Sequence, residues 1–234
     1  MDATYFLKNR TVFLRTFYST GAQGFVDVKQ KIETGQPPFD DPPYSEDPEP
    51  AYLAEWMEAA TALEALGMAA LSMLSDSLKL YLNTLADRVI GFSFDNSRSA
   101  FKQGFLSAYF SALGEILETD WSDCPVDRDL IEQVVLVRNR GQHSEHLSTF
   151  AVTLDAAMFE KHPRPFFISE DELSTLIAED GSLSSMLMPT IRVTAVGLQT
   201  AIDEVDALAD WIEDRLDRAH AWRLRKRSES EAGT

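Results

Sequence analysis

The sequence is poor in cysteine, in basic residues and in long apolar runs, and each shortage excludes a class of protein. Cys124 is the one cysteine in 234 residues, which excludes an internal disulfide framework and suits a reducing cytoplasm. No stretch approaches the roughly 20 uninterrupted apolar residues of a membrane span, and charges interrupt the N-terminal segment every few residues. We therefore expect a cytoplasmic chain with neither a secretory signal nor a membrane partner.

Positive charge is also scarce. Lys and Arg number 21 against 38 Asp and Glu, which gives a formal net charge of −17. Such a charge repels phosphate at long range, so it excludes a whole-surface nucleic-acid binder but not a local basic site. The apolar content of 44% is too high for a disordered chain.

The charge is unevenly distributed. Between Lys31 and Lys79 there is no basic residue, and half of the ten acids in that interval lie in residues 40–49, among six prolines that begin at Pro37. Proline restricts the residue before it, which predicts an extended loop over 35–50. We interpret this loop as a solvated linker, with a partner-binding or autoinhibitory loop as the alternative. The opposite sign gathers near the C-terminus, where four cations follow the last predicted helix: Arg223, Arg225, Lys226 and Arg227.

Apolar residues recur at helical spacing along most of the chain, which predicts an all-α bundle of five or six helices. The expected helices cover residues 4–32, 51–89, 98–118, about 127–137, about 169–181 and the region around 198–216. For the first of them we expect apolar contacts from Phe6, Val12, Phe13, Phe17 and Phe25.

One region departs from the helical spacing. Alternating residues from Phe150 to Leu154, followed by Phe166–Ile168, predict a small β-hairpin near 150–168. Ser169 and Glu172 then have the spacing of a capping box, in which Ser accepts from a backbone N–H and Glu reaches back. We expect one helical domain over 1–234, with segments 1–34 (first helix), 35–50 (loop), 51–147 (core), 148–182 (insertion with hairpin and short helix), 183–222 (last helix) and 223–234 (basic, then polar tail).

One cluster of residues can carry chemistry. The apolar helix through Val135 and Val137 ends in a run of polar groups: Arg138, Asn139, Arg140, Gly141, Gln142, His143, Ser144, Glu145 and His146. A structural interpretation is available, because glycine is common just past a helix end and cations in the last turn complement the helix dipole.

The pattern Arg138-Asn139-x-x-x-His143 resembles the signature of the HEPN superfamily (higher eukaryotes and prokaryotes nucleotide-binding domain). In that family an Arg, a polar residue that is often Asn, and a His four to six residues beyond the Arg lie at the end of an apolar helix in a four- or five-helix bundle. The resemblance covers roughly residues 51–147 and implies a HEPN-like bundle. The chain departs from the family pattern at Arg140-Gly141-Gln142, where an apolar residue often packs the turn.

The resemblance implies metal-independent RNA cleavage. The imidazole of His143 would move the proton of a 2′-OH or of the leaving 5′-oxygen, and Arg138 would hold the scissile phosphate through two parallel bonds. Asn139 would orient the histidine or the phosphate. Many catalytic members pair two motifs across a dimer interface, so the resemblance implies a homodimer, an RNA substrate and a toxin or phage-defence role, with an antitoxin or other protein as a further partner. It implies no cofactor.

Several alternatives stay open at this point. A second frame, Arg140 to His146, has a tolerated spacing, and we treat Arg140, Glu145 and His146 as neighbours of the site. A metal site on His143 and His146 lacks an evident third ligand, so we expect no metal. A non-catalytic HEPN module that binds nucleotide, RNA or a protein is the alternative function, and a helical scaffold is the third.

Overall fold

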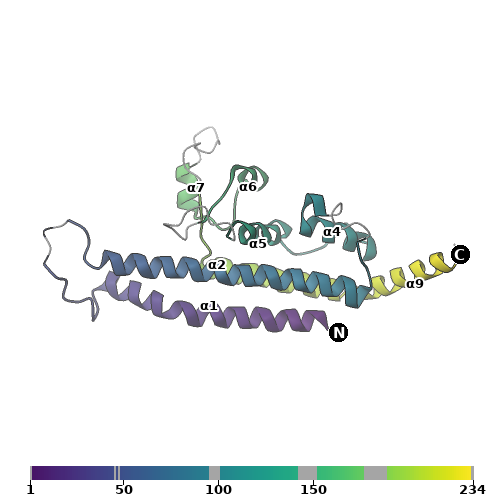
Figure 1. Ribbon diagram of the computed structural model, residues 1–234, viewed down its shortest axis with the longest axis horizontal. Helices are drawn as coiled ribbons and strands as arrows, with labels where there is room; N and C mark the ends of the chain where they lie inside the picture. Colours follow the sequence, from purple (N-terminus) through teal and green to yellow (C-terminus); the bar gives the residue numbers. More distant parts are fainter. Residues whose placement is uncertain are drawn as a thin grey trace. The chain divides into compact units, whose positions relative to one another are not determined.

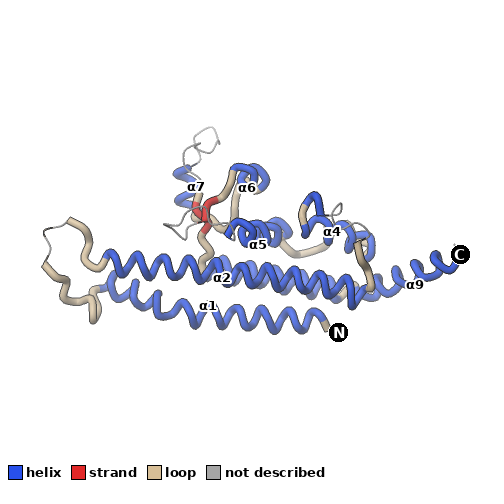
Figure 2. The backbone as a smooth tube through the Cα atoms, viewed as in Figure 1, coloured by secondary structure: helices blue, strands red, loops and turns tan. Residues whose placement is uncertain are grey.

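The computed structural model describes residues 2–44, 46, 48–94, 101–141, 152–176 and 189–232. Helix makes up 73% of it, and the described residues contain a single pair of two-residue strands (Figure 1; Figure 2). The all-α class predicted from the helical spacing is confirmed.

Eight α-helices lie in the described part of the chain. They are α1 (Ala3–Thr34), α2 (Leu53–Thr84), α4 (Phe105–Ile116), α5 (Arg128–Gly141), α6 (Ala156–Lys161), α7 (Glu170–Leu176), α8 (Ala195–Glu213) and α9 (Leu216–Ala232). A π-helical segment, Leu85–Ile90, continues α2, and a 3-10 turn, Phe101–Gln103, precedes α4. The helices expected over 4–32 and 51–89 therefore have nearly the predicted bounds, and the start expected at residue 98 lies outside the described residues.

The strands confirm the expected β-structure with one difference. β1 (Val152–Thr153) pairs antiparallel with β2 (Thr190–Ile191), and not with 166–168 as predicted. The Phe166 N–H donates to Gln133 Oε1 at 2.8 Å, and the Phe167 carbonyl accepts from Arg192 N at 2.7 Å. The backbone groups of Phe166 and Phe167 therefore bond to Gln133 and Arg192, and they do not pair with β1.

The capping box predicted at Ser169 is half correct. Ser169 Oγ accepts from the Glu172 N–H at 3.2 Å, as an N-cap does. The Glu172 carboxylate, which was expected to reach back to the cap residue, instead accepts from the Thr190 N–H at 2.7 Å. It therefore ties α7 to β2. The expected continuation of α7 to Gly181 lies outside the described residues.

The chain falls into two compact units. The first unit is Met1–Val12, Leu74–Glu132 and Ala201–Thr234, and the second is Phe13–Met73 and Gln133–Thr200. Each is described by itself below.

In the first unit the start of α1 runs antiparallel to α8. Thr4 Oγ1 donates to Glu213 Oε2 at 2.7 Å, and Thr11 Oγ1 donates to Asp206 Oδ1 at 2.8 Å. The residue number of the partner in α8 falls as the residue number in α1 rises, so the two helices run in opposite directions. The apolar repeat predicted for the last helix is buried as expected in its α8 part: Leu198, Ile202, Val205, Ala209 and Ile212. The single helix predicted over 183–222 is instead two, because the chain turns between α8 and α9.

In the second unit α1 and α2 form an antiparallel pair. Trp56 Nε1 donates to Glu33 Oε1 at 2.8 Å, and the Lys29 ammonium lies 4.1 Å from the centroid of the Trp56 ring. Gly67 of α2 packs against the backbone of Val193, so closely that a Cβ on it would overlap the Val193 carbonyl oxygen. This close approach requires glycine at position 67.

The apolar face predicted for α1 is wrong for most of its residues. Phe6, Val12, Phe13 and Phe25 are exposed, with exposed fractions from 38% to 61%. The buried positions are smaller or aliphatic and recur in steps of four and three from the helix start: Ala3, Leu7, Thr11 and Leu14, with Ala22 further along. Spacing decides which face is buried, and side-chain size does not.

The segment Leu53–Ile90 is long and apolar enough to cross a membrane by length and composition alone. Core helices of soluble proteins meet the same criterion, and residues of this one are buried within the protein: Ala70, Leu71, Leu74 and Leu78. The expected absence of a membrane span stays a prediction.

Candidate functional site

The C-terminal half of α5 is held on one face by three kinds of contact. The Val134 and Val137 side chains are buried, and Gln133, also buried, accepts from the Phe166 N–H. Arg140, one turn beyond Val137, reaches the Thr153 carbonyl with its Nε atom at 3.4 Å. Burial and hydrogen bonding therefore fix the rotation of this helix.

This rotation turns the predicted motif residues away from the anchored face. Successive helix residues are rotated by about 100°, which places Val137 and Arg140 within about 40° of Gln133. Arg138 and Asn139 are then rotated by about 140° and about 120° from Gln133. Burial does not separate the two arginines, because Arg138 and Arg140 are both half-buried, whereas Asn139 is exposed. The side of the helix that carries Arg138 also carries the buried Ile131, Val134 and Val135.

Arg138 and Asn139 contact each other. Arg138 Nη1 donates to Asn139 Oδ1 at 3.4 Å, while the Arg138 Nε atom is buried. A guanidinium with a buried stem and an amide acceptor beside it has its orientation restricted before any ligand binds. This pair can present N–H donors to a phosphate, in the way the resemblance implies for Arg138.

Arg140 has a different role from the one that the second motif frame would give it. Its Nη1 atom lies 3.5 Å from Asp155 Oδ2, and Asp155 is the N-cap of α6, where its side chain also accepts from the Met158 N–H at 2.7 Å. Arg140 therefore joins the end of α5 to the start of α6. The contacts of Arg140 explain its presence structurally.

Gly141 is the last residue of α5, so it lies within the helix and not just past its end as predicted. A Cβ at Gly141 would lie 2.6 Å from Met68 Cε on α2. α5 therefore passes close to α2 in the second unit, and because Met68 Cε is the end of a flexible side chain that can move aside, this approach does not by itself require glycine.

The remaining predicted site residues, His143, Glu145 and His146, lie outside the described residues, as does Gln142. Among the described residues no group of three or more His, Cys, Asp and Glu side chains could hold a metal ion. His162 is described and is buried, with its N–H bonded to the Met158 carbonyl.

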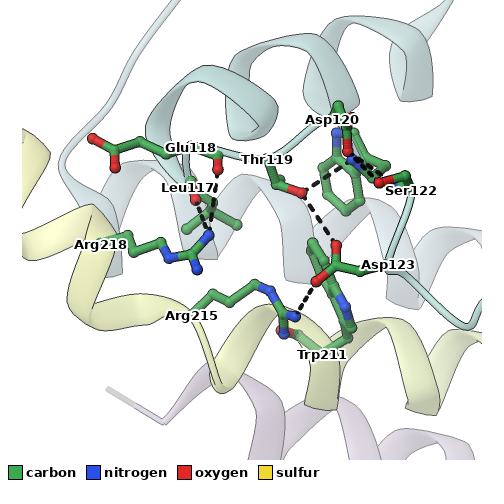
Figure 3. Close-up of polar contacts among 10 residues, drawn as sticks. Leu117, Glu118, Thr119, Asp120, Ser122, Asp123, Trp211, Arg215 and Arg218 are labelled. Atoms are coloured by element: carbon green, nitrogen blue, oxygen red, sulfur yellow. Dashed lines mark hydrogen bonds and ion pairs between the residues drawn. The ribbon is translucent and has the colours of Figure 1, made fainter.

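A second polar cluster, in the first unit, had no signal in the sequence analysis. Figure 3 shows it where the chain turns between α8 and α9. Arg215 Nη2 lies 2.7 Å from Asp123 Oδ2, its Nη1 donates to the Trp211 carbonyl at 3.1 Å, and its guanidinium carbon lies 3.8 Å from the Trp211 ring centroid. The Trp211 ring stacks on Trp121 with centroids 4.8 Å apart.

Hydrogen bonds within this cluster lower the pKa of two aspartates. The bond from Arg215 lowers the pKa of Asp123, and bonds from the Ser122 hydroxyl and N–H lower that of Asp120. Arg218 Nη1 donates to the Leu117 and Glu118 carbonyls at 3.0 and 3.3 Å, which satisfies carbonyls at the end of α4. The cluster joins α4, the loop after it and the α8–α9 turn, and we assign it a structural role.

The sequence contained no local signal for this cluster because its charged partners are 92 residues apart. Neither a family model, a curated protein nor a solved structure matches the chain.

Proposed function

We propose that this protein is a HEPN-type, metal-independent RNA endonuclease in which Arg138, Asn139 and His143 form the catalytic motif, two copies of which meet at a homodimer cleft. The observation that supports it is that the two arginines near the end of α5 have different contacts. Arg140 joins α5 to α6 through Asp155, whereas the half-buried Arg138 donates from Nη1 to the amide oxygen of the exposed Asn139.

The chemistry follows from the residue types. Arg138 holds the scissile phosphate and stabilises the negative charge that develops on it, and Asn139 orients the guanidinium through its amide oxygen. His143 takes the 2′-OH proton or gives one to the leaving 5′-oxygen. No metal is required for this transesterification, and a toxin or phage-defence effector is the biological role that the resemblance implies.

The test is RNA cleavage by the purified chain in EDTA, followed by gel electrophoresis. His143→Ala should lower kcat/KM by about 10²- to 10⁴-fold, the range of general acid–base catalysis. Arg138→Ala should lower it by about 10²- to 10³-fold, and Arg138→Lys should rescue it only in part, because lysine cannot form the two parallel bonds.

Arg140→Ala is the matched control on the same helix turn. This variant should retain cleavage and have a lower melting temperature, because it loses the ion pair between Arg140 and Asp155, the N-cap residue of α6. Full activity of both Arg138→Ala and His143→Ala would refute the motif assignment. Loss of activity in Arg140→Ala and His146→Ala, with Arg138→Ala active, would transfer the site to the second frame, and complete inhibition by EDTA would refute the metal-independent mechanism.

A non-catalytic HEPN module that binds nucleotide, RNA or a protein partner is the second candidate. The net charge of −17 favours it, because that charge opposes the repeated capture of a polyanionic substrate. This candidate predicts RNA binding that Arg138→Ala weakens, with no cleavage in any preparation.

A further inference from the structure

The strongest unassigned feature of the first unit is a group of cations around a pocket at the end of the π-helix. This basic pocket has a volume of about 380 Å³ and is lined by Arg88, Gly91, Trp222, Arg223, Lys226 and Arg227. Four of its six lining residues are cationic, in a chain whose net charge is −17. A local concentration of one sign against the overall charge is a selective site for an anion.

One of the cations shapes the pocket and three face an incoming ligand. Arg223 donates from Nε to the Ile90 carbonyl at 2.8 Å and from Nη2 to the Val89 carbonyl, which fixes α9 against the end of the π-helix. Arg88, Lys226 and Arg227 are exposed.

The carboxylates near these cations are only weakly engaged. Asp87 lies 3.9 Å from Arg88, and Glu229 lies 3.0 Å from Lys226, with all four side chains more than half exposed. Exposed ion pairs of this kind contribute little, so a phosphate can displace them. Arg227 has no ion pair among the described residues.

A second pocket adjoins the first and is aromatic. Its volume is about 280 Å³, and it shares Trp222 and Lys226 with the basic pocket; its other lining residues are Phe92, Phe94, Ala108, Ser111, Ala112, Glu115 and Ile116. Phe92 packs edge-on against both Phe94 and Trp222, with ring centroids 4.8 and 6.2 Å apart, and Phe94 packs edge-on against Tyr109. Neighbouring rings therefore hold these rings in place.

The charge of the two pockets fixes the orientation of a ligand that spans them. The aromatic pocket has one cation, Lys226, against the Glu115 carboxylate, whereas the basic pocket has four cations and no carboxylate in its lining, so an anion is favoured in the basic pocket. A flat ring stacks on aromatic side chains, and guanidinium groups hold a phosphate through paired bonds. From this juxtaposition we propose that the two pockets form one binding site for a nucleotide, with its base in the aromatic pocket and its phosphate among Arg88, Lys226 and Arg227.

This site goes beyond the proposed ribonuclease function, because it uses none of the residues of α5. The nucleotide can come from the free pool or be the terminal unit of an RNA. Free nucleotides and RNA ends share the same chemistry of ring and phosphate, and the experiment below separates them.

The test is isothermal titration calorimetry on the full chain with AMP, ATP, adenosine, pyrophosphate and two short RNAs that differ only in a 5′-phosphate. Nucleotide should bind more tightly than either adenosine or pyrophosphate, because neither fills both pockets. Arg88→Gln combined with Arg227→Gln should weaken nucleotide binding roughly tenfold or more. Phe92→Leu, at a residue that lines the aromatic pocket and not the basic one, should weaken nucleotide binding and leave pyrophosphate binding unchanged.

Arg225→Gln is the matched control. Arg225 is on the same helix but lies outside both pockets, where its Nη2 atom pairs with Glu118 Oε1 at 2.6 Å. It should bind nucleotide like the wild type, and circular dichroism should show that every variant remains folded.

Binding of AMP or ATP identifies the free pool as the source, and binding of the 5′-phosphorylated RNA alone identifies an RNA end. The proposal is overturned if no nucleotide or RNA end binds at millimolar concentration, or if the double variant binds as the wild type does. It is also overturned if Phe92→Leu leaves nucleotide affinity unchanged, because the basic pocket alone would then account for binding. The two RNAs are titrated into the His143→Ala variant, so no readout depends on RNA cleavage and the result is independent of the proposed function.

Discussion

Arg215 shows how one side chain can end a helix without glycine or proline. Its guanidinium takes the Trp211 carbonyl, which an α-helix would offer to the backbone N–H of residue 215. The Arg215 N–H bonds instead to the Ile212 carbonyl at 3.0 Å, three residues back. The ion pair between Asp123 and the same guanidinium stabilises this position of the Arg215 side chain, and α8 ends at Glu213.

The lowered pKa of Asp123 gives this contact a pH signature. A depressed folded-state pKa contributes stability above the ordinary aspartate value of 3.8, and the contribution is lost as pH falls below that value. Asp123→Asn should therefore be less stable than the wild type at about pH 6, and the difference should shrink at about pH 3. Urea denaturation at the two pH values measures it.

Asp214→Asn is the control for this prediction. It removes a neighbouring exposed carboxylate that has no side-chain partner among the described residues. A difference between Asp123→Asn and the wild type that stays constant or grows on acidification would contradict the assignment.

Residue identity in the motif was predictable only in part. The sequence offered Arg138 and Arg140 as the start of two frames, and its spacing could not choose between them. Nothing in the sequence indicates that Arg140 pairs with Asp155, a residue fifteen positions further along the chain that the fold brings near. Contacts of this kind are set by tertiary packing, and they produce no periodic pattern of residue types in the sequence.

At the scale of the element, two glycines in long helices allow the effect of packing on stability to be compared with the effect of helix propensity. Gly67 of α2 lies against the Val193 backbone, whereas a Cβ on Gly24 of α1 would have no atom within 4 Å. Alanine favours helix over glycine by about 1 kcal/mol, and forced overlap in a packed interior costs about 1–3 kcal/mol.

Gly67→Ala should therefore lower the free energy of unfolding, because its clash is with backbone and cannot be relieved by a side-chain rotation. Gly24→Ala should raise that free energy by up to about 1 kcal/mol. Chemical denaturation of the two variants beside the wild type measures both changes. A stabilised Gly67→Ala would show that α2 and the Val193 segment are not in close contact.

The long helices were predictable because their periodic signal extends over many turns, and α1 and α2 begin and end near their expected residues. The rotation of α1 was not predictable from its largest apolar side chains, since Phe6 and Phe13 are exposed while Thr11 is fully buried. The partner of β1 was missed because two-residue strands carry too short a pattern, and β2 begins 37 positions after Thr153.

At the scale of the whole molecule, the proposed catalysis requires two copies of the chain. One motif supplies a single arginine and a single histidine, so we predict a homodimer with a mass twice the chain's 26.2 kDa. Sedimentation equilibrium should give that mass, and specific cleavage activity should fall when the protein is diluted below the dimer dissociation constant. Undiminished specific activity of a monomeric preparation would contradict a shared cleft.

At this scale the distribution of the charge matters more than its sum of −17. In the sequence the acids of residues 40–49 form a concentrated group of one sign, and the cations of α9 that line the basic pocket form a group of the other. Such a charge distribution steers small anions to a defined place, while the whole chain still repels a long polyanion.

The stacked pair of Trp121 and Trp211 has an optical consequence. Two indoles whose centroids are 4.8 Å apart, at an interplanar angle of 27°, are close enough for their transition dipoles to couple, so we expect an exciton signal in the circular dichroism spectrum. Trp121 follows α4 and Trp211 belongs to α8. The protein therefore contains a built-in optical reporter for the joining of these two segments, which responds when they part even while every helix remains intact.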